Sequence, residues 1–170
     1  MRFKILGLMA AVALVAACET GPEGGAGAGG AGAKPVETFT APLGVLVKPG
    51  SQEDLVVNVG DRVFFDFDKF NLKADARKTL EKQAAWMKAN PSVTVTVEGH
   101  ADERGTREYN LALGERRANS VKDYLAALGV NSARMKTISY GKERPVASGS
   151  NETAWSQNRR GVTKVTGAGT

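Results

Sequence analysis

The chain has 170 residues, room for about one domain, and its 42% hydrophobic and 24% charged residues are typical of a soluble globular part. Its single cysteine excludes an internal disulfide. The formal net charge is only +5, acidic and basic residues are interleaved, and two of the basic residues fall in a removable leader, so the sequence does not favour a nucleic-acid-binding function.

The first residues have the order of a bacterial signal peptide. Two basic residues precede an apolar run over residues 5–15, which is too short for a transmembrane helix, and two alanines follow it. Cys18 comes directly after the alanines, which resembles the lipobox of bacterial lipoproteins. The resemblance implies that residues 1–17 are a signal peptide and that Cys18 carries the lipid; the alternative is an ordinary secretory signal with a chance cysteine. Glu19, in place of Asp, favours the outer membrane by resemblance to enterobacterial sorting.

Glycine and alanine dominate the segment that follows Cys18. Residues 19–42 show no hydrophobic periodicity and cannot bury enough apolar surface to offset the entropy of ordering them. We therefore predict a lipid-anchored, Gly/Ala-rich linker over residues 18–54, which is disordered or loosely structured, and a globular domain over residues 55–170.

The globular part begins with a strand of aromatic and β-branched residues over positions 62–68, and a turn follows it. Asn71 is the predicted N-cap of the first long helix, and Asn90-Pro91 ends that helix. Apolar residues spaced by four, four and three indicate one buried helical face. This face consists of Ala76, Leu80, Ala84 and Met87.

The clearest alternation in the chain predicts a second strand. Val93, Val95 and Val97 alternate with polar residues, so one face of this strand is buried. A second long helix follows and ends before Gly129, a natural C′ residue. Its predicted apolar face consists of Leu111, Ala118, Val121, Leu125 and Leu128. The remaining predicted elements are a strand over 135–140, a helix over 151–159 and a strand over 161–165. The order is βαβαβαβ, which packs helices against one sheet.

The polar loop over residues 98–106 and the helix after it hold the main candidate site residues. Arg117 lies four residues after Leu113 and four before Val121, so it points toward the sheet and requires an anionic partner. Two interpretations stay open. In the first, Asp102 and Arg117 form a structural ion pair. In the second, they bind the two charged groups of one zwitterionic ligand: Asp102 binds an ammonium, and Arg117 binds a carboxylate in bidentate fashion.

The run GHADERGTREYNLALGERRANSVKDYL over residues 99–125 resembles the motif of OmpA-like peptidoglycan-binding domains. The runs FFDFDK, SYGKERP and QNRRGV also match, and the resemblance covers about residues 63–165. Arg107 stands where proline is frequent in the family, and Gly161 where alanine is common. With the leader and the linker, the chain is similar to the lipid-anchored members of this family that act in the Tol–Pal system.

The resemblance implies a fold, a ligand and a partner. The fold is α+β, an OmpA-like βαβαβαβ domain with helices on one mixed sheet. The function is non-catalytic: an outer-membrane lipoprotein facing the periplasm binds the meso-diaminopimelate of the peptidoglycan stem peptide, ties the membrane to the cell wall and supports cell division. The partner protein is TolB. The implied binding residues are Asp102 and Arg117, with Phe67, Asp68, Arg104 and Leu113 completing the pocket.

Two other functions are weighed against this one. A hydrolase would need His100, Asp102 and Glu103 as a metal site or a base, but the chain has one histidine, the spacing is poor for zinc, and Cys18 is lipidated rather than a free nucleophile. We therefore expect no catalysis, metal or cofactor, and interpret His100 as a hydrogen-bonded residue that shapes the loop. The second alternative is a periplasmic protein-docking module with a structural Asp102–Arg117 ion pair.

Several conspicuous side chains are interpreted as structural. In the phenylalanine cluster of the first strand, only Phe67 lies close enough to the strand's end to be a pocket residue. Trp86 and Trp155 fall on predicted helices and are expected to pack. Arg159 and Arg160 are expected to form a solvated charged face.

Overall fold

The protein is described by a computed structural model over residues 47–167. Its centre is a four-stranded mixed sheet with the strand order β1-β4-β2-β3. The parallel pair is β2 and β3, whereas β4 runs antiparallel to both of its neighbours, β1 and β2. The strands span Arg62–Phe64 (β1), Thr94–His100 (β2), Met135–Gly141 (β3) and Arg160–Gly167 (β4).

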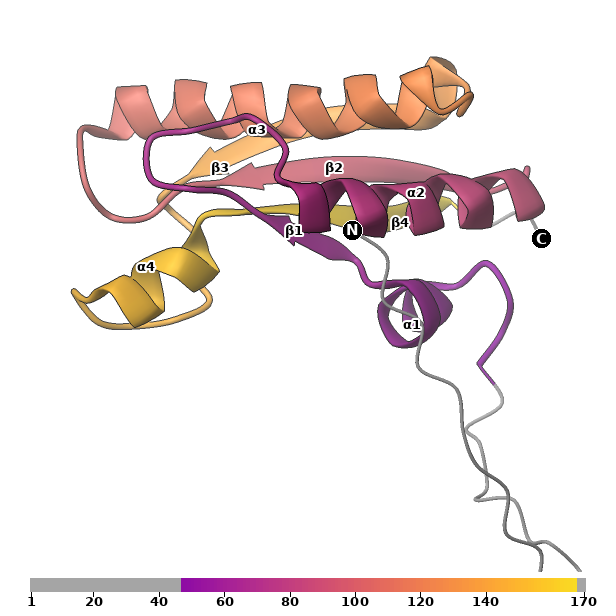
Figure 1. Cartoon of the computed structure of the whole chain (residues 1–170), viewed down its shortest axis with the longest axis horizontal. Coiled ribbons are helices and arrows are strands. Elements are labelled where there is room, and N and C mark those ends of the chain that lie inside the picture. Colours follow the sequence, from indigo (N-terminus) through magenta and orange to yellow (C-terminus); the bar gives the residue numbers. More distant parts are fainter. Residues whose placement is uncertain (1–46, 168–170) are drawn as a thin grey trace, which may run out of the picture. The chain divides into compact units, whose positions relative to one another are not determined.

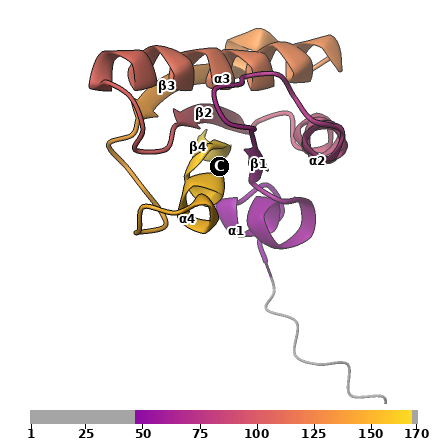
Figure 2. The same cartoon turned by 60° about the vertical axis from the view of Figure 1, so that its left-hand side comes forward.

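Two long helices cover one face of the sheet, as Figures 1 and 2 show. They are α2 (Ala74–Ala89) and α3 (Arg107–Ala127). The short helices α1 (Gln52–Asp54) and α4 (Glu152–Asn158) lie on the other side of the sheet in both views. A π-helical turn over Leu55–Val59 follows α1, and a 3₁₀ turn over Ser132–Arg134 precedes β3. The predicted α+β class and the βαβαβαβ order from β1 onward are confirmed.

The core lies between the sheet and the two long helices, as the spacing of the apolar residues predicts. Val93, Val95 and Val97 of the predicted second strand are buried, as are all four residues of the predicted α2 face. Asn90 is the C-cap of α2, and Gly129 has the positive φ of 91° that a C′ residue requires.

Two predicted details of the first elements are wrong. The strand β1 ends at Phe64, and the chain from Phe65 to Lys73 is a loop rather than the predicted strand end. Helix α2 begins at Ala74 after Lys73, so Asn71 is not its N-cap. The buried side chain of Arg117 holds the segment after β1 as a loop by hydrogen bonds to the carbonyls of Asp66 and Lys69. No local sequence pattern marks this contact.

The buried face of α3 also differs from the prediction at its first residue. Leu111 is exposed, and Leu113 is buried in its place. The reason is a close approach of backbone to backbone: a Cβ on Gly99 of β2 would lie 1.8 Å from the carbonyl oxygen of Gly114. Helix α3 therefore rests on β2 at Gly114, and this contact turns Leu113 and Arg117 inward.

The ordered domain begins before residue 55. Ser51 is the N-cap of α1, and Asp54 accepts a hydrogen bond of 2.8 Å from the indole Nε1 of Trp86. Leu55 is fully buried in the core. These contacts order residues that we predicted to be part of the linker. The predicted signal peptide, Cys18 and the linker before residue 47 lie outside the described residues. Within residues 47–167, no helix is long and apolar enough to cross a membrane.

Candidate binding site between the loops and helix α3

A cavity of about 170 Å³ opens where the loop after β1 and the loop after β2 meet the first turns of α3. All six predicted pocket residues line it: Phe67, Asp68, Asp102, Arg104, Leu113 and Arg117. Three lining residues were not predicted: Gly105, Tyr109 and Asn110. Tyr109 and Asn110 precede Leu113 by four and three residues, so the helical period that places Leu113 in the cavity could have found them.

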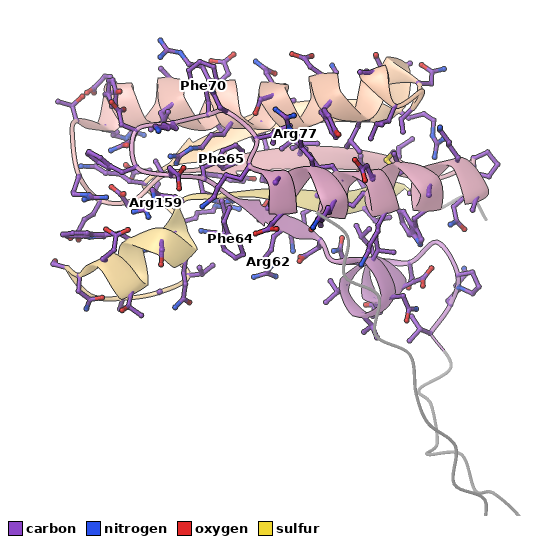
Figure 3. All side chains as sticks on the ribbon, in the orientation of Figure 1. Arg62, Phe64, Phe65, Phe70, Arg77 and Arg159 are labelled. Atoms are coloured by element: carbon purple, nitrogen blue, oxygen red, sulfur yellow. The ribbon has the colours of Figure 1, made fainter. Side chains whose placement is uncertain are left out.

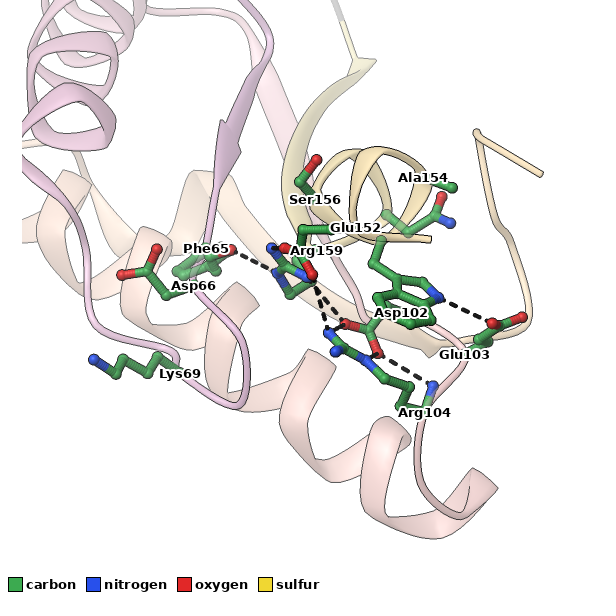
Figure 4. A network of polar contacts seen from close by, with 12 residues as sticks. Phe65, Asp66, Lys69, Asp102, Glu103, Arg104, Glu152, Ala154, Ser156 and Arg159 are labelled. Atoms are coloured by element: carbon green, nitrogen blue, oxygen red, sulfur yellow. Dashed lines mark hydrogen bonds and ion pairs between the residues drawn. The ribbon is translucent and has the colours of Figure 1, made fainter. Parts of the chain in front are cut away.

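Asp102 is the buried carboxylate of the site. Its Oδ1 accepts hydrogen bonds from the backbone N–H of Arg104 at 3.1 Å and from Nε of Arg104 at 3.2 Å. Its Oδ2 accepts from Nη2 of Arg104 at 2.6 Å and from Nη1 of Arg159 at 3.3 Å, as Figure 4 shows. Burial opposes the charge, but the bonds from Arg104 and Arg159 outweigh it, so the pKa of Asp102 lies below its ordinary value of 3.8.

Arg117 is fully buried and donates to three backbone carbonyls. The bonds run from Nε to Lys69 at 2.8 Å, from Nη1 to His100 at 2.8 Å and from Nη2 to Asp66 at 3.1 Å. Burial lowers the pKa of Arg117 to about 10, which leaves the guanidinium charged at neutral pH. Two of the five N–H groups of its guanidinium remain after these bonds.

The structural ion pair between Asp102 and Arg117, one of the two interpretations left open above, is therefore not formed. Among the described residues, the ion-pair partners of Asp102 are Arg104 and Arg159, and Arg117 binds carbonyl oxygens instead. The charges still influence each other, because Asp102 raises the pKa of Arg117 against the larger effect of burial. The two residues face the same cavity without neutralising each other by contact.

Arg104 covers Asp102 on the solvent side. Its guanidinium carbon lies 4.0 Å from the ring centroid of Phe67 and 4.0 Å from that of Trp155. Such cation–π contacts are worth about 0.5–1 kcal/mol each at exposed sites. Trp155 in turn donates from Nε1 to Glu103 at 2.9 Å. The predicted packing role of Trp155 thus includes holding an arginine of the site.

Arg159 was predicted to lie on a solvated face, and that prediction is wrong. It is 5% exposed and donates from Nε to the carbonyl of Phe65 at 3.0 Å, besides its bonds to Asp102 and Glu152. The buried carboxylate accounts for its position, since a buried anion requires a cation nearby. No sequence signal links residue 159 to residue 102, because the two lie on different loops.

Hydrogen bonds fix the loop after β2 around the cavity. Gly105 has a φ of 93°, and the Thr106 side chain caps α3 by accepting from the N–H of Tyr109. The amide of Asn110 donates to the carbonyl of Arg104 at 2.9 Å. Tyr109 also donates its hydroxyl to the carboxylate of Asp68, a residue whose own φ is +55°. The cavity wall is therefore preorganised.

His100 does not make the hydrogen bonds that we predicted for it. Both ring nitrogens are buried and lack a partner among the described residues. Glu98 Oε2 is 3.6 Å from Nε2, too far for a hydrogen bond. The carbonyl of His100 nevertheless shapes the site, because it accepts from Arg117. Within the described part of the chain, no three His, Cys, Asp or Glu side chains are placed to hold a metal ion.

The fold and this cavity place the chain in the class of α+β domains that carry a charged pocket between two loops and a helix. The chain belongs to the OmpA family, whose model matches residues 64–159. It is 62% identical over 121 residues to the "Peptidoglycan-associated lipoprotein" of Agrobacterium fabrum, covering 71% of this chain and 68% of the relative. It is 42% identical over 159 residues to the protein of the same name from Pseudomonas aeruginosa, covering 94% and 93%. The predicted resemblance is confirmed.

Solved structures agree with this assignment. The crystal structure of the peptidoglycan-associated lipoprotein from Burkholderia pseudomallei is 43% identical, with a TM-score of 0.61, and the match covers 62% of this chain and 89% of that one. The C-terminal domain of Helicobacter pylori MotB has a TM-score of 0.59 at 23% identity, covering 63% of this chain and 84% of that one. The second likeness concerns the fold alone.

Proposed function

We propose that this protein is a non-catalytic outer-membrane lipoprotein that binds peptidoglycan at the cavity between the loops and α3. The observation that carries the proposal is the cavity itself, which presents a buried carboxylate, Asp102, and a buried guanidinium, Arg117, that are not paired with each other. Relatives named peptidoglycan-associated lipoprotein, at up to 62% identity, indicate the polymer to which such a site is directed.

The proposed ligand is the free end of meso-diaminopimelate in the stem peptide, which carries an ammonium and a carboxylate on one carbon. Asp102 binds the ammonium. Its contacts with the Arg104 side chain are exchangeable, because that side chain is 30% exposed at the cavity rim. An ammonium that replaces the Arg104 guanidinium substitutes one cation for another, so the buried carboxylate is never left unpaired.

Arg117 binds the carboxylate through its two remaining N–H groups. Its guanidinium is held rigidly by three carbonyls, and the carbonyls satisfy hydrogen bonds without neutralising the charge. A buried charge without an anionic partner is costly, and the ligand carboxylate supplies that partner. Phe67 and Leu113 line the cavity beside the aliphatic part of the ligand, and Asp68 is a further carboxylate of the cavity lining.

The remaining parts of the proposal concern the whole chain. Residues 1–17 are removed as a signal peptide, Cys18 carries the lipid, and the linker up to the ordered domain lets that domain reach the cell wall from the outer membrane. Non-covalent binding then ties membrane to wall and releases it when the envelope constricts at division. Docking to TolB within the Tol–Pal system belongs to the same proposal, and competition with peptidoglycan regulates it.

Calorimetric titration of residues 19–170 against two stem peptides tests the ligand. One peptide carries diaminopimelate and the other carries lysine, which lacks the second carboxylate. The proposal predicts binding of the first alone. Equal binding of both would show that Arg117 does not recognise a carboxylate. Binding of neither would favour a protein-docking module.

A further inference from the structure

A second cavity, of about 390 Å³, lies on the sheet face that α2 and α3 leave uncovered. It is lined by side chains of three strands and of the loop after β3, among them Arg62, His100, Arg144, Arg160 and Lys164. Figure 3 shows Arg62 on the side of β1 away from α2. The β4 residues of the cavity alternate along the strand, so they share one face, opposite the core valines.

Cations exceed anions in this second cavity. Asp61 and Glu98 face four basic side chains, which leaves an excess of two positive charges when His100 is neutral. Asp61 is occupied by Arg62, with contacts of 2.8 and 3.0 Å. Of the described ion pairs within 4.0 Å, none involves the other three cations, Arg144, Arg160 and Lys164.

Arg160 is the most buried of these cations, at 4% exposure. It donates from Nη1 to the carbonyl of Asn158 at 3.4 Å and from Nη2 to the carbonyl of Arg144 at 3.1 Å. Burial, followed by repulsion from Arg62, lowers its pKa. A buried guanidinium that has carbonyl partners but no carboxylate is stabilised when an anion enters.

Two further groups face the same space with donors available. The Arg144 guanidinium stacks on the ring of Tyr140 at 3.7 Å, a geometry that leaves its N–H edges open. His100 is 1% exposed with two unpartnered ring nitrogens. Burial, then Arg160 and Arg144, lower the pKa of His100 to about 3, so its ring is neutral and offers one N–H donor. Buried polar atoms without partners are rare in native proteins, and a ligand oxygen in this cavity would accept the hydrogen bond of the ring N–H.

We propose that this second cavity binds a phosphate group through Arg144, Arg160 and Lys164, with His100 donating from within. A phosphate near neutral pH carries a charge of about −1.5 to −2, which matches the excess of two cations better than the −1 of a carboxylate. Guanidinium groups suit phosphate because their planar N–H donors match its oxygens. The phosphate is either free or part of a lipid headgroup, which presents the same chemistry. The site is separate from the Asp102 cavity and does not depend on peptidoglycan binding.

The test is a titration of the ¹⁵N-labelled full chain, in a non-ionic detergent, with inorganic phosphate at constant ionic strength. Saturable shifts are expected at the amides of His100, Arg160 and Gly161. Arg144→Gln and Lys164→Gln alter exposed side chains, so both variants are expected to fold, and each is expected to weaken binding on the order of tenfold. Lys82→Gln, an equal loss of charge on the exposed face of α2, is the matched control and leaves binding unchanged.

Glycerol 3-phosphate, the part of phosphatidic acid that remains without its acyl chains, distinguishes the sources. Tighter binding than that of inorganic phosphate assigns a lipid headgroup, and the reverse order assigns a free phosphate. Two results overturn the proposal. One is the absence of saturable shifts at these amides. The other is an equal effect of Lys82→Gln and Arg144→Gln, which would mean that phosphate responds only to the net charge of the protein.

Discussion

The network around Asp102 in the first cavity and the cations around Arg160 in the second cavity treat buried charge in opposite ways. In the first, Asp102 is surrounded by Arg104 and Arg159, and Glu152 completes a network of paired charges, outside which Arg117 has carbonyl partners only. In the second, Arg160 is buried with carbonyl partners only. Removing one member of a balanced network leaves its partner as a buried charge without a counter-charge. Removing one of several like charges relieves repulsion instead. The same type of substitution should therefore have opposite effects in the two cavities.

The largest effect is expected for Asp102→Ala. Arg159, with a side chain only 7% exposed, loses its buried partner, so the free energy of unfolding should fall by about 3–5 kcal/mol. Urea unfolding followed by circular dichroism measures this change. The control is Asp66→Ala, because Asp66 pairs with Lys73 where both side chains are half exposed, and its loss should cost less than about 1 kcal/mol. Similar losses for the two variants would contradict the balanced network.

Arg117→Lys is expected to have the next largest effect. A lysine ammonium cannot reach the carbonyls of Asp66, Lys69 and His100 together, so buried acceptors lose their donors. We expect a loss of about 2–4 kcal/mol in unfolding free energy. Binding of the diaminopimelate peptide should also fall by more than about tenfold. The neighbouring Arg116→Lys, at an exposed position, should change neither quantity. An unchanged Arg117→Lys variant would refute the role assigned to the guanidinium.

A pH dependence should come from the second cavity. His100 has a folded pKa of about 3, below its ordinary value of 6.5, so its stabilising contribution is complete above pH 6.5 and is lost progressively as pH falls toward 3. The protein should therefore be about 2 kcal/mol less stable at pH 5 than at pH 7 in a phosphate-free buffer. His100 is the single histidine of the chain, and the His100→Gln variant should lose this dependence. Persistence of the slope in the variant would assign it to another group.

The smallest effect is expected for Lys164→Gln without phosphate. It removes one of three cations that have no carboxylate contact, so the unfolding free energy should stay within about 0.5 kcal/mol of the wild type or rise slightly. Thermal unfolding in chloride buffer measures it. A clear destabilisation would mean that Lys164 takes part in a stabilising contact, and the contrast between the cavities would then fail.

The set of six cavity residues was predicted from the resemblance to OmpA-like domains. From the residues alone, the alternating valines predict β2, and the spacing of Leu113, Arg117 and Val121 predicts that Arg117 points toward the sheet. All six residues line one cavity. Their roles in binding peptidoglycan stay a prediction, as do the domain boundaries outside residues 47–167.

The partners of the charged residues could not be predicted. Arg117 binds backbone carbonyls, and every residue has a carbonyl, so no side-chain pattern marks the acceptor. Arg159 reaches Asp102 across 57 positions in the chain. The exposure of Leu111 has a similar origin, because the Gly99–Gly114 contact, rather than the apolar pattern, sets the rotation of α3 on the sheet. Contacts between elements decided each of these cases.

One residue connects the two cavities. The carbonyl of His100 accepts the bond from Nη1 of Arg117, while the imidazole of the same residue lines the second cavity. A ligand that displaced this residue in either cavity would therefore move a group that contacts the other. Thermodynamic linkage then requires reciprocity: the factor by which phosphate changes the affinity for the stem peptide equals the factor by which the stem peptide changes the affinity for phosphate.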